Sequence, residues 1–102
     1  MIYSKPVGIP KQAERISELF RTVAHPARIG ILQMLDEGDK NLHELYEQFG
    51  CSQSVMLQHI RILRDWSLIE CKKEGTSKYC TIQAGNLSQL IECAHTCIEQ
   101  LT

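Results

Sequence analysis

Cysteine is the residue type in this 102-residue chain with the most evident chemistry, and it occurs five times: Cys51, Cys71, Cys80, Cys93 and Cys97. The number is odd, and the N-terminus, MIYSKPVGIPK, lacks the apolar segment of a secretory signal. A framework of structural disulfides is therefore not expected. The open alternatives are binding of a soft metal, response to oxidation, and filling of an apolar core.

Cys93 and Cys97 lie four residues apart, which places both thiols on one face of a predicted helix. Two thiolates so placed could share a soft metal or metalloid ion, with Cys51, His95 or a residue of a second subunit as third ligand. They could also oxidise, although this helical spacing is slightly too wide for a relaxed disulfide. The alternative, which we favour slightly, is that both are small apolar residues of a dimer interface.

The other three thiols occupy different positions. Cys71 and Cys80 are expected to lie opposite each other across a hairpin whose turn is Glu74 to Ser77, and for them core packing is favoured over sensing. Cys51 directly precedes the N-terminus of a predicted helix, where the helix dipole favours a thiolate. We therefore expect Cys51 to be the most reactive single thiol, close to any DNA that this helix contacts.

That helix lies within residues 52–69, SQSVMLQHIRILRDWSLI, and carries the second candidate site. Met56, Ile60 and Leu63 recur at helical spacing and are expected to face the core. The other side carries hydrogen-bonding and cationic side chains suited to a DNA major groove: Gln53, Ser54, Gln58, Arg61 and Arg64. The alternative is an ordinary solvated helix face, and the flanking segments must decide between the two.

The flanking segments predict a mainly α fold with a β-hairpin wing (α+β). Residues 1–10 read as an extended N-terminal arm, and residues 11–102 as a single domain. Hydrophobic periodicity and capping residues predict helices over residues 11–24, 26–37, 42–49, 52–66 and 86–101, and strands over 68–73 and 78–82. The order α-α-α-α-β-β-α, with a tight turn at Gly50, is that of a winged helix-turn-helix. The wide apolar stripes of the first and last helices suit a dimer interface.

The predicted wing is basic although the chain is not. The net charge is −1 and the pI about 6.4, whereas many nucleic-acid-binding domains are basic overall. Cations nevertheless outnumber anions between residues 61 and 78, and only local charge contacts phosphate. We expect the wing to contact the DNA backbone or minor groove through Lys72, Lys73, Thr76, Ser77 and Lys78.

Three segments together, LFRTVAHPARIGILQML, SQSVMLQHIRILRDWSLIE and KKEGTSKYCTI, resemble the ArsR/SmtB family of small winged-helix repressors. The resemblance covers residues 19–82 and implies a homodimer through the first and last helices. It also implies that the dimer binds an imperfect palindromic operator in double-stranded DNA, represses transcription, and releases the operator when a metal ion or redox signal arrives.

On matching positions, the resemblance assigns DNA contacts to Gln53, Ser54 and Gln58, whereas Arg61 and Arg64 are better phosphate candidates. Leu57 stands where the family often has Ser or Gly, so it could contact a thymine methyl instead of donating a hydrogen bond.

The sensor sites of the family are incomplete in this sequence. The third-helix segment, NLHELYE at residues 41–47, has no cysteine. Three of the four positions of a second metal site lack the usual ligands, since the four hold Ala84, Asn86, Cys97 and Gln100. Gln33 replaces the second-helix cysteine of the sulfur sensors. A thiol sensor in this chain must therefore use other cysteines.

Three functions compete. The first is a repressor that needs no cofactor and releases DNA in response to a thiol-directed signal, either a redox change or a soft metal or metalloid. The second is a constitutive DNA-binding regulator without an inducer, and the third a thiol- or metal-handling protein that does not bind DNA. An enzyme is not expected, because no catalytic constellation has a recognisable spacing. No run is long and apolar enough to span a membrane, so a cytoplasmic location is expected.

Overall fold

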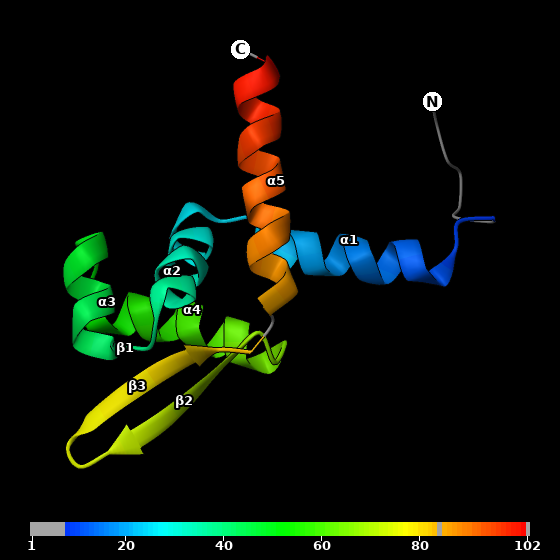
Figure 1. Ribbon diagram of the computed structural model, residues 1–102. Helices are drawn as coiled ribbons and strands as arrows, with labels where there is room; N and C mark the ends of the chain where they lie inside the picture. The colour runs from blue at the N-terminus through cyan, green and yellow to red at the C-terminus, as the bar shows by residue number, and fades with distance from the viewer. Residues whose placement is uncertain (1–7, 84, 102) are drawn as a thin grey trace.

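The computed structural model describes residues 8–83 and 85–101. Most of the predicted arm at residues 1–10, and Ala84, lie outside the described residues. The elements follow in the order α1 (Lys11–Val23), α2 (Pro26–Glu37), β1 (Lys40–Asn41), α3 (Leu42–Phe49), α4 (Gln53–Asp65), β2 (Ile69–Glu74), β3 (Ser77–Ile82) and α5 (Gly85–Leu101) (Figure 1). The predicted mainly α fold with a β wing is confirmed.

Local chemistry explains where the helices begin. Pro26 occupies the first turn of α2, where its missing N–H costs nothing, and the His25 ring nitrogen Nδ1 accepts a hydrogen bond from the Ala27 N–H at 3.1 Å. At the start of α3, the side chain of Asn41 accepts from the Glu44 N–H at 2.8 Å. The Glu44 carboxylate in turn accepts from the Asn41 N–H at 3.1 Å, which completes a capping box.

The sheet has three strands rather than the two of the predicted hairpin. Its order is β1-β3-β2, with both pairs antiparallel. The hairpin turn lies where the sequence predicts it, because Glu74 pairs with Ser77 and Cys71 with Cys80. The additional strand, β1, consists of two residues that pair with Cys80 and Tyr79 of β3. The wing is therefore joined to the segment that leads into α3.

The core lies where α2, α3 and α4 meet the sheet. From α2, Ile31 and Leu32 are fully buried, and they meet buried side chains of the other elements, namely Leu45, Met56, Leu63 and Cys80. Gly30 of α2 allows a close approach of α3, because a Cβ atom there would lie 2.6 Å from Cε1 of Phe49. This packing fixes α3 and α4 relative to the central helix α2.

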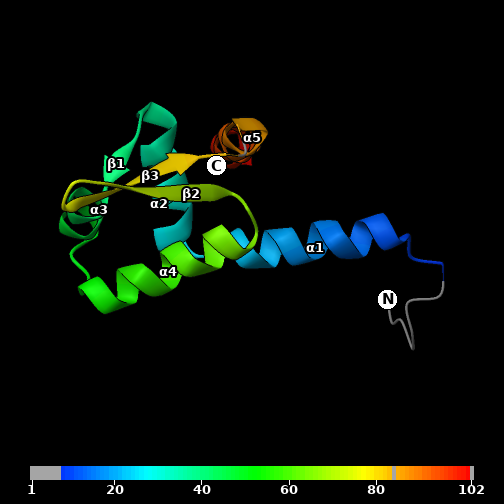
Figure 2. The ribbon, with the colours of Figure 1, turned by 90° about the horizontal axis from the view of Figure 1, so that it is seen from below.

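The first and last helices extend away from this core. In Figure 1, α1 runs to the right of the body and α5 rises above it, and Figure 2 shows α5 nearly end-on beside the sheet. Both helices carry exposed apolar side chains: Ile16, Phe20, Leu90, Ile98 and Leu101. Within the described part of the chain, the length and apolarity of every helix fall short of those needed to cross a membrane.

Candidate nucleic-acid interface and thiol sites

A tight turn sets the direction of α4 relative to α3. Gly50 ends α3 in the left-handed region at φ 62°, and its N–H donates to the Tyr46 carbonyl at 3.1 Å. Two residues later, Ser52 begins α4, and its Oγ accepts from the Val55 N–H at 3.2 Å. These residues build the helix-turn-helix that the sequence predicts, with α4 in the place of the recognition helix.

The two sides of α4 divide as predicted. Met56 and Leu63 are fully buried and Ile60 is 2% exposed, so this stripe anchors α4 to the core. All side chains of α4 that were predicted to contact DNA are exposed: Gln53, Ser54, Leu57, Gln58, Arg61 and Arg64. At 37% exposure, Leu57 presents an apolar surface within this polar face.

One end of α4 meets the wing, defined as β2, β3 and the turn between them. A hollow of about 300 Å³ brings together Gln53 from α4 and Thr76, Ser77 and Lys78 from the wing. Its other lining residues come from the start of α3 and the residue before it: Asn41, Leu42, His43 and Tyr46. The structure thus unites side chains from two separately predicted DNA-contact segments.

Positive charge is concentrated beside this hollow. Lys73 and Lys78 are directly opposite each other across the two strands, and both are exposed, as is Lys72. Two like charges in this arrangement repel each other. A phosphate group between or beside them would relieve that repulsion, so the pair suits an anionic backbone.

Arg64 lies at the opposite end of α4 from Gln53. It lines a separate hollow with Ser67, Ile69, Glu70 and Gln83, at the base of the hairpin. Arg61 is exposed one turn closer to the middle of the helix. The structure therefore does not bring Arg64 together with the wing turn, and its assignment to phosphate remains a prediction.

A cluster that the sequence did not predict ties α4 to the start of α2. The Arg28 Nε–H donates to Nδ1 of His59 at 3.2 Å, and another Arg28 nitrogen donates to the Thr22 carbonyl at 2.7 Å. The rings of His25 and His59 lie 4.5 Å apart between centroids. Burial lowers the pKa of His59 below 6.5, and the nearby charges of His25 and Arg28 lower it further. Through these contacts His59 packs against the start of α2.

The thiols of α5 do not form a complete metal site in one protomer. Cys93 and Cys97 are both exposed, and Nδ1 of His95 lies 3.1 Å from a carboxylate oxygen of Glu99. Among residues 8–83 and 85–101, no three His, Cys, Asp or Glu side chains come together in a way that could hold a metal ion. Neither Cys51 nor His95 therefore completes a metal site with Cys93 and Cys97 within one protomer. A residue of a second subunit is the remaining candidate for the third ligand.

Cys71 and Cys80 are the two thiols that the structure places in contact. Their Sγ atoms lie 3.0 Å apart across the hairpin. Cys80 is fully buried and Cys71 is half-buried. Cys51 is half-buried too, and it packs against the core beside the turn between α3 and α4. Core filling, the favoured interpretation for Cys71 and Cys80, thus describes Cys80 better than Cys71.

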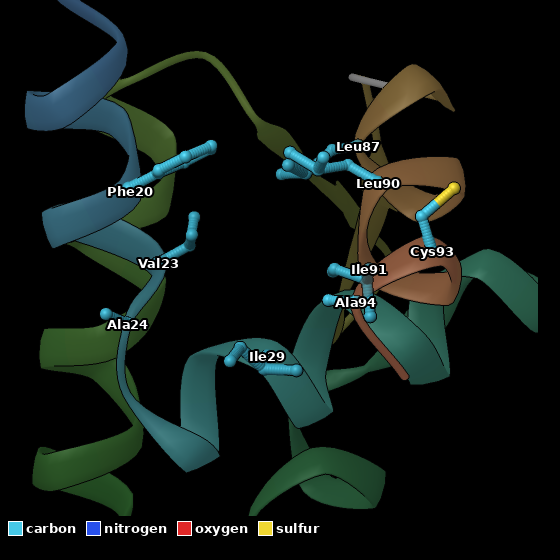
Figure 3. Close-up of a pocket in the computed structure, with 9 residues that line it drawn as sticks. All are labelled: Phe20, Val23, Ala24, Ile29, Leu87, Leu90, Ile91, Cys93 and Ala94. Carbon is cyan, nitrogen blue, oxygen red and sulfur yellow. The ribbon is translucent and has the colours of Figure 1, made fainter. Parts of the chain in front are cut away.

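An apolar groove separates α1 from α5. Its lining residues are Phe20, Val23, Ala24, Ile29, Leu87, Leu90, Ile91, Cys93 and Ala94, and its volume is about 500 Å³. Figure 3 shows Phe20 and Val23 on one side facing Leu87 and Leu90 on the other, with Ile29 below. Sequence periodicity predicts the apolar faces of both helices, but the groove arises from their placement.

Comparison with known proteins identifies the family to which this chain belongs. The profile of the family described as "Bacterial regulatory protein, arsR family" matches residues 25–70, from the N-cap of α2 into β2. Rv0081 of Mycobacterium tuberculosis, an uncharacterized HTH-type transcriptional regulator, is 33% identical over 79 residues, which cover 76% of this chain and 69% of Rv0081. The chain belongs to the ArsR/SmtB family. It is a DNA-binding transcriptional regulator and not an enzyme.

Solved structures of ArsR/SmtB proteins have the same fold. The crystal structure of Rv0081 superimposes with a TM-score of 0.80 at 28% identity, covering 96% of this chain and 94% of that one. The transcriptional repressor BigR from Xylella fastidiosa gives 0.77 at 26% identity, covering 84% and 88%. HlyU from Vibrio cholerae, a transcriptional activator, gives 0.76 at 27% identity, covering 86% and 96%. The match to Rv0081 covers nearly the whole chain and therefore includes both α1 and α5.

Proposed function

We propose that this ArsR/SmtB regulator is a cytoplasmic homodimer that represses transcription from an imperfect palindromic operator and releases it on a thiol-directed signal. The observation that carries the DNA-binding part is the continuous surface of Gln53, Thr76, Ser77 and Lys78. No cofactor is needed for this function. A soft metal or metalloid ion would enter only as an inducer, and an oxidant is the other candidate.

The apolar groove between α1 and α5 supports the homodimer. Phe20 and Leu90 on its two sides are 47% and 43% exposed, which is unusual for large apolar side chains that lie close together. A chain of this length buries a limited core, so association of two copies adds apolar burial. Two-fold symmetry would then place the two α4 helices about one DNA turn apart, roughly 34–36 Å.

The chemistry of the polar surface supports a specific operator. Gln53 can both donate and accept, as the bidentate recognition of adenine requires in the major groove. Lys73 and Lys78 supply charge for the phosphates without sequence preference. A regulator with both parts gains affinity from the wing and selectivity from α4.

The positions of the thiols support the proposed release of the operator on a thiol-directed signal. All five cysteines are free, and they occupy α5, the wing and the turn before α4. Modification at the wing or at the turn would act next to the DNA-binding surface, whereas modification on α5 would act at the proposed dimer interface. Either position could change the affinity for DNA.

Fluorescence anisotropy with the promoter fragment of its own operon tests this function. The reduced, peroxide-treated and metal-loaded protein is titrated at one fixed salt concentration, because salt alone changes the affinity. We expect tight binding of the reduced dimer and weaker binding after oxidation or metal loading. Equal affinities in all three states would refute release and favour a constitutive regulator. Failure of every state to bind specifically would refute the proposed operator.

Two further measurements test the remaining parts. Light scattering is expected to give the mass of a dimer in the absence of DNA, and a monomer would refute the proposed interface. A reporter gene under the same promoter is expected to rise when the regulator is deleted. Because the relative HlyU is an activator, a fall in reporter expression would refute repression while leaving operator binding intact.

A further inference from the structure

We propose that Cys71 and Cys80 are a peroxide-reactive dithiol, which closes to a disulfide between the two strands of the wing. The inference deepens the proposed function and rests on it in one respect: it names the thiols through which an oxidant would reach the regulator. The sequence alone favours core packing for this pair, and the geometry of the wing now points to a reactive site.

The backbone register brings the pair within bonding range. Cys71 and Cys80 are directly opposite in the antiparallel ladder of β2 and β3. Opposite residues in such a ladder have Cα atoms about 4.5 to 5.5 Å apart, which lies within the range that disulfides span. With the Sγ atoms 3.0 Å apart, the bond can form without a change of strand register. Cys93 and Cys97 lack such a contact and stand on successive turns of α5.

The two thiols differ in a way that assigns them separate roles. Cys80 is fully buried, so an oxidant in solution meets the half-buried Cys71 first. The hydrogen bond from Cys80 lowers the pKa of Cys71 to about 7, with help from the positive charges of Arg64 and Lys78 and against burial and Glu70. The same contact and burial raise the pKa of Cys80. Cys71 is therefore the nucleophile, and Cys80 keeps its proton as the resolving thiol.

The reaction with hydrogen peroxide balances in two steps. The Cys71 thiolate attacks one peroxide oxygen, the O–O bond breaks, and the leaving hydroxide takes a proton to become water. Cys71 is now a sulfenic acid. The Cys80 sulfur then attacks the Cys71 sulfur and loses its proton, the S–O bond breaks, and a second water leaves. Overall, two thiols are oxidised to one disulfide and one peroxide is reduced to two waters.

A disulfide at this position would alter the DNA-binding surface. Cys80 belongs to the core, and its neighbours on β3, Tyr79 and Lys78, lead directly to the wing turn that borders Gln53. Drawing the two sulfurs together changes the local twist of the hairpin and the packing of Cys80 at once. The wing turn would then present Lys78 and Ser77 differently to a DNA backbone.

Peptide mapping of the full-length protein after treatment with hydrogen peroxide at pH 7 tests the proposal without any substitution. The expected product is a cross-linked peptide that joins residues 71 and 80, with the loss of two hydrogens from the intact mass. Oxidation confined to Cys51, or a disulfide between Cys93 and Cys97, would overturn the proposal.

Variants then test the assigned roles. Cys80→Ala should stop at a sulfenic acid on Cys71 that dimedone traps, whereas Cys71→Ser should abolish the rapid reaction of the pair. The matched control, Cys93→Ser with Cys97→Ser, should oxidise as the wild type does. The rate should rise with pH and reach half its plateau near pH 7, because the thiolate is the reacting form. A rate that is flat between pH 6 and 8 would overturn the assignment of Cys71 as nucleophile.

Operator binding separates this proposal from the function on which it rests. Weaker binding by the disulfide form, restored by a reductant, supports both. If the disulfide between Cys71 and Cys80 forms but the operator affinity does not change, the pair is confirmed as a peroxide-reactive dithiol. The same result would refute release of the operator through oxidation of this pair. Weaker binding of oxidised protein that persists in Cys71→Ser overturns the dithiol as sensor and leaves the proposed function standing.

Discussion

The contact between Gly30 and Phe49 makes the packing of the helix-turn-helix open to a quantitative test. In Gly30→Ala, the added Cβ would lie 2.6 Å from Cε1 and 2.9 Å from Cζ of the Phe49 ring, so the ring or the end of α3 must move. Overpacking of this kind costs about 1–3 kcal/mol. Replacing glycine by alanine inside a helix returns about 1 kcal/mol. We therefore expect the substitution to lower the free energy of unfolding by about 1 kcal/mol.

Changing Phe49 should reverse the sign of this effect. A leucine at position 49 lacks the two ring atoms that clash, and its Cδ atoms end near the position of the phenylalanine Cδ1, which lies 3.8 Å from the added Cβ. That distance is an ordinary contact, so only the helix-propensity gain remains. In the Phe49→Leu background, Gly30→Ala should therefore raise the free energy of unfolding by up to about 1 kcal/mol. The coupling between the two positions is then about 2 kcal/mol.

Urea unfolding of the four proteins, followed by circular dichroism, measures this cycle. The protein concentration is held constant, because the stability of a dimer depends on it. Thermal unfolding is a second readout, in which 1 kcal/mol shifts the Tm by about 4–8 °C for a domain of this size. If Gly30→Ala changes the stability equally in both backgrounds, the clash with Phe49 is not what the glycine avoids.

Four other predictions test the proposed DNA-binding surface, the proposed dimer and a titrating group. Gln53→Ala should cost about 1–3 kcal/mol of specific operator binding in anisotropy titrations, while the remote control Gln100→Ala should cost nothing measurable; equal losses would remove Gln53 from the interface. Lys78→Gln should weaken binding to all sequences alike and reduce the slope of log affinity against log salt by about 1, and an unchanged slope would exclude a phosphate contact. Phe20→Glu should convert the dimer to a monomer in light scattering, because it places a charge in the apolar groove, and a persistent dimer would exclude that interface. Because the pKa of His59 lies below 6.5 in the folded state, its contribution to stability is present above pH 6.5 and is lost as the pH falls further. Urea unfolding at pH 7 and pH 5 should thus show a smaller acid-induced loss for His59→Asn than for the wild type, and equal losses would contradict the effect of burial on His59.

Local signals in the sequence account for most of the fold. The residues that cap the helices, the tight turn at Gly50 and the hairpin turn from Glu74 to Ser77 each depend on residues close in sequence, and each prediction is confirmed. Strand β1 escaped prediction because two residues are too few for any periodicity. It exists because β3 offers it an edge, which is a tertiary effect.

The candidate sites depend more strongly on contacts between distant residues. The turn predicts that Cys71 and Cys80 are opposite, but the full burial of Cys80 follows from the packing of the helices against the sheet. The Arg28 side chain reaches His59 across 31 positions of sequence, and no spacing rule predicts such a contact. DNA binding by the exposed side chains of α4 remains a prediction, which the variant Gln53→Ala tests.

The two-residue strand β1 affects how the wing and α3 unfold locally. Lys40 pairs with Cys80 and Asn41 pairs with Tyr79, and the same Asn41 caps α3. Amide hydrogens at the start of α3 and in β3 should therefore exchange with solvent as one cooperative unit. A wing held only by its own hairpin would fray independently of the helices. In this chain, loosening the wing would also loosen the beginning of α3. A chemical change on β3 would therefore reach the helix-turn-helix through the hydrogen bonds between β3 and β1 and through the backbone that continues from β1 into α3.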